Sequence, residues 1–324
     1  MPSAEAPTDQ ATMRAVVARQ WGGPEVLEPV TIARPEPGPT EILVAVHAAG
    51  VNPTDWKSRA SGGFGQWGNP PILGYDVSGV VEAVGLGASL FKPNDEVFGM
   101  PRFPEQAGGY AEYVAAPSRR FARKPEGLDH VQAAALPLVG LTAWQALVEV
   151  AQVQPGQRVL IHAAAGGVGH VAVQVAKALG AYVIATASAP KHALVRSLGA
   201  DELIDYRETD FAQTLSGLDM VLETIGGENG MRSLATLRRG GILVWLPGPL
   251  DPDVEARGDE LGVRSGLTLV EPDRAGLLAI TELVESGKLR VEIAEVLPLA
   301  DAARAHRLGE SNRTTGKLVL KVRD

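Results

Sequence analysis

The chain contains no cysteine among its 324 residues. It can therefore form no disulfide and offer no thiolate to a metal ion, which excludes a cysteine-rich structural zinc lobe and a cysteine-ligated catalytic zinc. The six histidines stand apart without paired ligand spacing, so we interpret each as a packing or surface side chain: His47, His130, His162, His170, His192 and His306. We expect no metal site.

Long hydrophobic runs are also missing. The longest apolar stretches are strand-sized and interrupted by glycine or charge, which argues against a membrane-spanning helix. The polar N-terminus lacks the basic start and apolar core of a signal peptide, so we predict a disordered leader over residues 1–12 and a cytoplasmic location. A net charge of −8 with scattered basic residues argues against nucleic acid as a principal partner.

The most informative segment that is present, residues 159–180, leads from a short apolar run through a glycine turn into a helical pattern. The turn matches the pattern A-x-G-x-x-G, with Ala164, Gly166 and Gly169 in the small-residue positions. Free backbone N–H groups and the positive end of a helix dipole converge there, as phosphate binding requires. We therefore predict a dinucleotide-phosphate site formed by Ala165, Gly166, Gly167, Val168 and Gly169.

Strand-like and helix-like segments alternate after this turn. Strands are expected at 181–186, 201–206, 218–223 and 242–246, and helices at 193–198, 231–237 and 273–285. This alternation predicts an α/β fold with a doubly wound parallel Rossmann sheet. The length of the chain exceeds what one core normally organises, so a second domain is expected.

The end of the second strand bears on the choice of dinucleotide. NAD-binding folds usually carry an acid about 20 residues beyond the glycines, where it binds the ribose 2′-hydroxyl. Here the segment offers Thr186, Ser188 and Lys191 instead, which suits a 2′-phosphate and favours NADPH. Lys191 also fits a solvated position in the next helix, and Tyr206 fits either an adenine contact or a half-buried strand aromatic.

The N-terminal third has a different pattern of predicted secondary structure. Short β-type runs at 14–18, 41–49 and 77–85 are separated by glycine and proline, and a helical stretch at 133–147 is broken near Pro137. We place the domain boundary there. The predicted division is a mostly-β catalytic domain over 13–131 and 288–324, with the nucleotide-binding domain over 132–287 between its two parts.

Several segments carry a family resemblance over nearly the whole chain. They are 50–55 (GVNPTD), 73–81 (LGYDVSGVV), 136–144, 163–169, 305–308 and 315–320. On these motifs the chain resembles the medium-chain dehydrogenase/reductase superfamily, specifically its zinc-independent NADPH:quinone oxidoreductase group, zeta-crystallin-like. The resemblance implies that the mostly-β domain is GroES-like.

The resemblance also bears on metal chemistry. Zinc-dependent relatives carry a cysteine where this chain has Asn52, and a His-Glu pair where it has Tyr75 and Asp76. Without a Lewis acid to polarise an alcohol, an already activated electrophile such as a quinone or an α,β-unsaturated carbonyl becomes the expected small-molecule acceptor of a hydride from NADPH. The alternative is an NADPH-binding structural or regulatory protein with little turnover.

Two side chains are candidate catalytic hydrogen-bond donors to the developing oxyanion, Asn52 and Tyr75. Asn52 also fits an ordinary Asn-Pro turn, and Asp55 fits an N-cap for a short helix, so we assign no carboxylate as a base. The candidate substrate-pocket residues are Asn52, Trp56, Phe64, Trp67, Phe103 and Trp245. The remaining candidate cofactor contacts are Thr142, Leu246, Pro247, Gly248, Asn312 and Arg313, of which the last two rest on the resemblance.

The segment 262–270 reads as an edge strand of the nucleotide-binding sheet. Relatives commonly pair through that edge, and an exposed apolar edge strand favours pairing, so we expect a homodimer.

Overall fold

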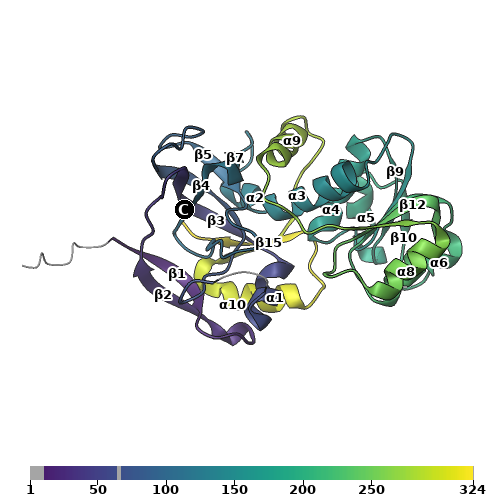
Figure 1. Cartoon of the computed structure of the whole chain (residues 1–324), viewed down its shortest axis with the longest axis horizontal. Helices are drawn as coiled ribbons and strands as arrows, with labels where there is room; N and C mark the ends of the chain where they lie inside the picture. The colour runs from purple at the N-terminus through teal and green to yellow at the C-terminus, as the bar shows by residue number, and fades with distance from the viewer. Residues whose placement is uncertain (1–10, 64–66, 324) are drawn as a thin grey trace, which may run out of the picture.

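The computed structural model describes residues 11–63 and 67–323 and shows two lobes, each built on its own sheet (Figure 1). The nucleotide-binding lobe occupies the right half of Figure 1, and the other lobe occupies the left half. Helices α2 (His130–Ala134) and α3 (Pro137–Trp144) lie between them.

The nucleotide-binding lobe contains a sheet in which all paired strands are parallel. Its strands are β8 (Arg158–Ile161), β9 (Tyr182–Thr186), β10 (Glu202–Ile204), β11 (Leu218–Glu223), β12 (Leu237–Trp245) and β13 (Arg264–Leu267). Their spatial order is β10-β9-β8-β11-β12-β13. The order reverses at β8, and ligands of such sheets bind beyond the carboxyl ends of the strands at that point. The predicted Rossmann fold is confirmed.

Helices cover both faces of this sheet. They are α4 (Gly167–Ala178), α5 (His192–Ser197), α6 (Phe211–Thr214), α7 (Glu228–Leu234) and α8 (Pro252–Leu261). Successive strand residues point to opposite faces, so Val159 and Ile161 enter one apolar core whereas Leu160 enters another. A sheet buried on both sides explains why its strands are apolar throughout.

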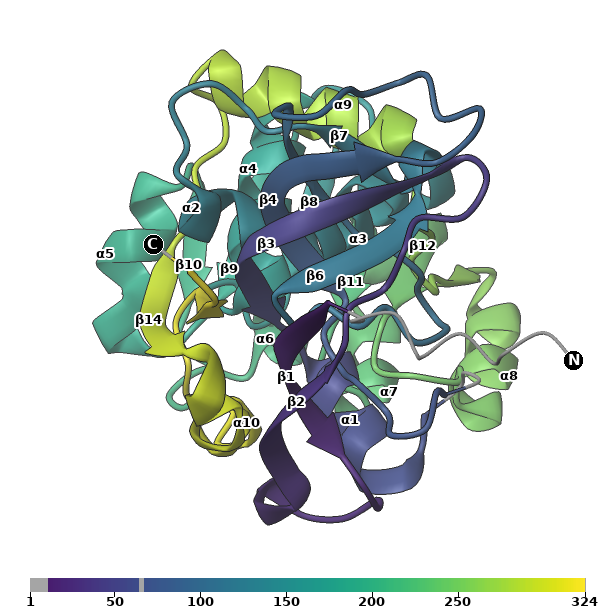
Figure 2. The same ribbon diagram turned by 90° about the vertical axis from the view of Figure 1, so that its left-hand side faces the viewer.

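The other lobe is built on a mostly antiparallel sheet with the order β14-β15-β3-β4-β5-β7, where β6 also pairs with β3. Its strands are β3 (Glu41–Val51), β4 (Asp76–Val84), β5 (Glu96–Gly99), β6 (Tyr113–Pro117), β7 (Phe121–Arg123), β14 (Ile293–Pro298) and β15 (Lys317–Lys321). A separate hairpin joins β1 (Thr12–Ala18) to β2 (Leu27–Ala33). The front view of this lobe shows β3, β4 and β6 side by side (Figure 2).

The remaining helices complete the two lobes. They are α1 (Pro53–Ser61), the π-helical turn Gln145–Val150, α9 (Arg274–Glu285) and α10 (Ala302–Glu310), with 3-10 turns at Pro24–Val26, Ser118–Arg120, Ala189–Lys191 and Leu299–Asp301. Pro137 is the first residue of α3. The backbone N–H that a proline lacks has no partner within the helix at this position, so a helix can start there. This start accounts for the helix break that the sequence predicted near Pro137. No helix among residues 11–63 and 67–323 is long and apolar enough to cross a membrane.

Several boundaries differ from the sequence predictions. Thr12, predicted in the leader, pairs with Ala33 at the start of β1, whereas residues 1–10 lie outside the described residues. The predicted helix at 231–237 ends at Leu234, because β12 begins at Leu237 and pairs there with Leu218. The elements that were not predicted from the sequence are strands β2, β5, β6, β7 and β14 and helices α6, α8 and α10. We keep the division at residues 131/132 and 287/288 as our proposal for the two domains.

Candidate active site

The glycine turn connects β8 to α4, and its third glycine is required by packing. A Cβ on Gly169 would lie 2.3 Å from the carbonyl oxygen of Ala163 and 2.7 Å from the Cα of Ala164. Gly166 is the N-cap of α4, and no side chain accepts a hydrogen bond from the first turn. A Cβ on Gly166 would meet a single atom, the Ala163 oxygen, at 3.2 Å. The helix start is therefore open to an anion on the Gly166 side and tightly packed on the Gly169 side.

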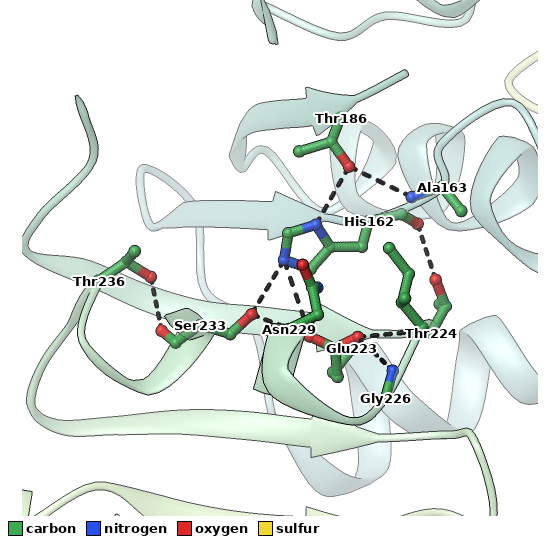
Figure 3. A network of polar contacts seen from close by, with 10 residues as sticks. His162, Ala163, Thr186, Glu223, Thr224, Gly226, Asn229, Ser233 and Thr236 are labelled. Atoms are coloured by element: carbon green, nitrogen blue, oxygen red, sulfur yellow. Dashed lines mark hydrogen bonds and ion pairs between the residues drawn. The ribbon is translucent and has the colours of Figure 1, made fainter. Parts of the chain in front are cut away.

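A buried polar network lies beneath this turn (Figure 3). His162, at the end of β8, contacts Thr186 Oγ1 through Nδ1 at 3.1 Å and Ser233 Oγ through Nε2 at 3.0 Å. The Ser233 hydroxyl donates to Glu223 at 2.9 Å, so it must accept from Nε2–H of His162. Nδ1 is then the acceptor, and Thr186 donates to it. Burial lowers the pKa of His162 to about 4, which keeps the ring neutral.

The Glu223 carboxylate is completely buried and accepts four hydrogen bonds. Its donors are the Ile225 and Gly226 amides, the Asn229 side chain and Ser233. The network therefore joins the carboxyl ends of β8, β9 and β11 to α7, and it holds the floor of the predicted cofactor site. It also uses the Thr186 hydroxyl, which is 1% exposed and was predicted to face the cofactor.

The residues predicted to select NADPH lie at the junction of the two lobes. Lys191 Nζ donates to the carbonyl oxygens of Arg313 and Thr314 at 3.1 and 3.4 Å, so this ammonium joins the β9–α5 connection to the loop after α10. Ser188 is 6% exposed and immediately precedes the 3-10 turn that contains Lys191. The structure therefore brings the Lys191 side chain to the backbone of Arg313, which was also proposed from the sequence as a cofactor contact.

Sequence reasoning missed one acid in this region. Asp205 follows β10, and its carboxylate accepts from the backbone N–H groups of Ala189 and Arg207 at 2.8 and 3.0 Å. These hydrogen bonds hold the pKa of Asp205 below its usual range. Its neighbour Tyr206 is 55% exposed, and the Arg207 guanidinium lies 5.8 Å from the centre of its ring. The sequence did place Asp205 near the end of the third predicted strand, and this position could have indicated that its carboxylate lies near the predicted cofactor site.

The loop after β12 and the helix α3 carry the other cofactor candidates. Leu246 donates its backbone N–H to Glu223 O, and Pro247 O accepts from Lys57 Nζ of α1 at 3.2 Å. Gly248 follows with a φ of 148°, a conformation that favours glycine. Thr142 is buried and donates to Leu138 O within α3. Asn312, with a φ of 55°, precedes Arg313 in an exposed left-handed turn.

The candidate donor Asn52 belongs to a buried charged cluster. It is the N-cap of α1, and its backbone N–H donates to Asp55 at 2.7 Å. Asp55 is therefore not the N-cap that the sequence allowed but the third helical residue. The Asn52 side chain donates through Nδ2 to Asp76 at 2.9 Å and accepts through Oδ1 from Lys317 Nζ. Lys317 Nζ also donates to Val51 O at 2.9 Å and lies 3.7 Å from Asp76.

Burial dominates the electrostatics of this cluster. It raises the pKa of Asp55 to about 7 and raises that of Asp76, and it lowers that of Lys317. The Lys317 ammonium opposes the shift at Asp76, and the Asp76 carboxylate opposes the shift at Lys317. Each charge therefore makes the other tolerable inside the protein.

Tyr75, the second candidate donor, is 2% exposed. Its hydroxyl donates to Pro104 O at 3.4 Å and lies 3.5 Å from Ser58 Oγ. Burial raises the pKa of Tyr75 to about 12, so the hydroxyl keeps its proton. Both hydrogen bonds are long, which leaves the hydroxyl weakly held.

The predicted pocket aromatics are dispersed. Phe103 packs edge-on against Tyr75 with ring centroids 5.0 Å apart. Trp67 instead packs against Trp21, and Trp56 packs against Gly309 of α10 within the lobe of the mostly antiparallel sheet. Trp245 is buried at the end of β12, and Phe64 lies outside the described residues. Among the described members of this set, Phe103 is the one with a ring contact to a candidate donor.

The side chains around Asn52 do not fit a zinc ion. Asn52 and Asp76 stand where zinc-dependent relatives carry ligands, and here both contact the Lys317 ammonium. An ammonium that fills the space between two such oxygens excludes a second cation by repulsion. Across the part of the chain that the structure describes, no group of three or more His, Cys, Asp or Glu side chains is placed to hold a metal.

Comparison with known proteins supports the class that the fold and site define, a two-domain dehydrogenase/reductase with a GroES-like lobe. Residues 38–126 match the alcohol dehydrogenase GroES-like domain, and residues 198–320 match the family described as zinc-binding dehydrogenase. Human quinone oxidoreductase is 35% identical over 97% of this chain and 99% of its own length. The chain belongs to the quinone oxidoreductase group of the medium-chain dehydrogenase/reductase superfamily, which confirms the resemblance.

Solved structures give the same result. The quinone oxidoreductase from Coxiella burnetii is 39% identical with a TM-score of 0.91 and covers 97% of this chain and 100% of that chain. A mycobacterial protein in complex with NADPH is 32% identical with a TM-score of 0.86, over 96% of this chain and 100% of that chain.

Proposed function

We propose that the protein is an NADPH-dependent, metal-free oxidoreductase that transfers a hydride to a quinone or an α,β-unsaturated carbonyl compound. The observation that carries this proposal is the helix start at Gly166, which has no side-chain cap, combined with the Lys191 and Arg313 junction nearby. An uncapped helix start suits a diphosphate, and the Lys191 ammonium beside the Arg313 backbone suits a further phosphate. The names of the relatives support the quinone as acceptor class.

The cofactor supplies the hydride when bound. In the protein, the N–H groups of Gly167 to Gly169 would hold the diphosphate, because the Gly166 N–H already donates to Ala163 O at 2.8 Å. The side chains of Lys191 and Arg313 would bind the 2′-phosphate. Asn52 and Tyr75 donate hydrogen bonds to the acceptor oxygen as negative charge develops on it, which lowers the barrier more than it stabilises the bound acceptor. The reduced product takes its proton from water, so no carboxylate acts as an acid.

The Asn52 side chain has one N–H donor without a partner among the described residues. Its amide carries two N–H groups, and the one partner of Nδ2 among the described residues is Asp76. Tyr75 keeps a proton on a weakly held hydroxyl. Both side chains are buried, so an acceptor must displace the groups that cover them. We expect Phe103, which packs against Tyr75, to contact the ring of the bound acceptor.

The test is cofactor oxidation by the purified protein. Absorbance at the reduced-nicotinamide band is followed with NADPH and with NADH, each against a panel of quinones, enones and enals. We expect turnover with NADPH and at least one acceptor, at a kcat/KM well above that with NADH. Binding of NADPH without oxidation by any acceptor would instead favour the structural or regulatory alternative.

We also propose that the protein forms a homodimer through β13. This strand lies at the edge of the nucleotide-binding sheet and pairs only with β12 in the described structure. Leu267 and Leu269 at this edge are 51% and 53% exposed. An apolar edge with unpaired backbone groups favours association with a second copy.

A further inference from the structure

Lys317 is the most unusual side chain in the described structure, because it is a lysine buried in the interior of the catalytic lobe. It opens β15, and only 3% of it is exposed. Removing an ammonium from water is expensive unless partners replace the lost hydration. Its position therefore calls for an explanation beyond strand formation, which an apolar residue would serve better.

The ammonium contacts three oxygens. It donates to Val51 O and to Asn52 Oδ1, and it lies 3.7 Å from Asp76 Oδ2. An ammonium has three N–H donors and no acceptor, so its capacity is used on this cluster. Asn52 Oδ1 is consequently identified as the oxygen of the amide, and Nδ2 faces Asp76. The two charged partners allow only one orientation of the Asn52 amide.

The stem of Lys317 lies beside the glycine turn. Its Cδ is 3.3 Å from the place that a Cβ on Gly167 would occupy, and Gly316 N donates to Ala165 O at 2.9 Å. A lysine at this place could serve the cofactor diphosphate, yet the ammonium is directed to Asn52 and Asp76. These contacts therefore favour a role for Lys317 in binding the acceptor rather than the cofactor.

We propose that Lys317 is a positioning residue for the acceptor: its ammonium fixes the Asn52 amide with one N–H free and supplies the fixed positive charge beside it. This inference rests on the proposed function, in which Asn52 binds the acceptor oxygen. Hydrogen bonding of a cation to Oδ1 polarises the amide, so its N–H groups become stronger donors. In this way a protein side chain provides positive charge at a site whose residues do not fit zinc.

The test is Lys317→Met in the full-length protein, with Lys321→Met as matched control. Lys321 lies on the same strand but is exposed. NADPH affinity is measured by the fluorescence of the bound nicotinamide, and kcat and KM by steady-state oxidation with the best acceptor. We expect the NADPH Kd to change less than ~2-fold while kcat falls ~100-fold, the size associated with a misplaced donor. Lys317→Arg, which keeps the charge, should recover part of kcat.

Loss of the ammonium leaves Asp76 unpaired and can prevent folding, so circular dichroism is checked first. If Lys317→Met does not fold, the pair Asp76→Asn with Lys317→Met, which removes both charges of the Lys317–Asp76 pair, is measured in its place against Asp76→Asn alone. A fall in NADPH affinity with kcat retained would make Lys317 a cofactor-phosphate contact and overturn the proposal, as would unchanged kinetics. Absence of turnover in the wild type would refute the proposed function itself, and this inference with it.

Discussion

Replacing either of two glycines in one turn by alanine should separate packing from cofactor binding. On Gly169 the new methyl group would lie 2.3 Å from Ala163 O and 2.7 Å from Ala164 Cα, roughly 1 Å closer than the ~3.5 Å at which carbon atoms pack. Both contacts are backbone atoms that cannot rotate away. Overpacking of this kind costs about 1–3 kcal/mol, partly offset by the ~0.5–1 kcal/mol that alanine gains over glycine in a helix.

Gly169→Ala should therefore lower the free energy of unfolding by ~1–2 kcal/mol, which corresponds to a fall in Tm of roughly 1.5–3 °C for a protein of this size. Gly166→Ala is the matched variant, because its methyl group meets only one atom, at 3.2 Å. It should leave Tm nearly unchanged but weaken NADPH ~10-fold or more, since the second glycine of such turns admits the diphosphate.

Urea unfolding followed by circular dichroism and NADPH titration by fluorescence measure the two effects on the same samples. The reasoning would be refuted if Gly169→Ala were as stable as the wild type. It would fail equally if Gly166→Ala bound NADPH normally, because the diphosphate would then not approach that face of the turn.

Three further outcomes are expected. Lys191→Glu should weaken NADPH ~10-fold and leave NADH nearly unchanged, because a carboxylate repels the 2′-phosphate but not a diol; equal effects on both cofactors in titrations would remove Lys191 from the site. The Asp55 carboxyl has its pKa raised to about 7 in the folded protein, so the folded state binds more protons between about pH 4 and 7 and stability falls as the pH rises through that range. Asp55→Asn should flatten this slope, by up to ~1.4 kcal/mol per pH unit, in urea unfolding repeated at several pH values; an unchanged slope would assign it to other groups. Leu267→Asp should shift the protein from dimer to monomer in sedimentation velocity, whereas Leu86→Asp, at a position 85% exposed in the other lobe, should not; a wild-type monomer would contradict the edge-strand interface.

Elements with strong local signals could be predicted from the sequence. The strand 218–223 was predicted with its observed bounds, since it is a buried apolar run that ends where the backbone turns. The glycine turn and the helix break at Pro137 could likewise be predicted, because residues close together in the sequence determine them. β12 began five residues earlier than predicted, because its Arg-Arg-Gly-Gly start has no apolar pattern and pairs only at Leu237 before a bulge.

What the sequence could not predict in the site are contacts between distant residues. Thr186 was predicted to bind the cofactor, and its hydroxyl donates to His162, which lies 24 positions earlier. Asn52 was predicted as a hydrogen-bond donor, but nothing in the sequence indicated that its amide also contacts Asp76 and Lys317, the latter 265 positions later. The only local sign of Lys317 was a lysine at the start of an apolar strand, and nothing nearby in the chain indicates where its ammonium goes.

The return of the chain to β15 has a consequence for biosynthesis. β15 pairs with β3 at Ala48 to Val51, whereas β6 pairs with the first half of the same edge. The second half of this edge therefore stays unpaired while the ribosome makes the whole nucleotide-binding lobe. During that interval the early strands present free backbone groups, the kind of edge on which nascent chains aggregate. The middle lobe can fold as soon as it emerges, but the first-made lobe is completed last. A frameshift just upstream of the β15 codons should therefore damage the part of the protein that was translated before the nucleotide-binding lobe.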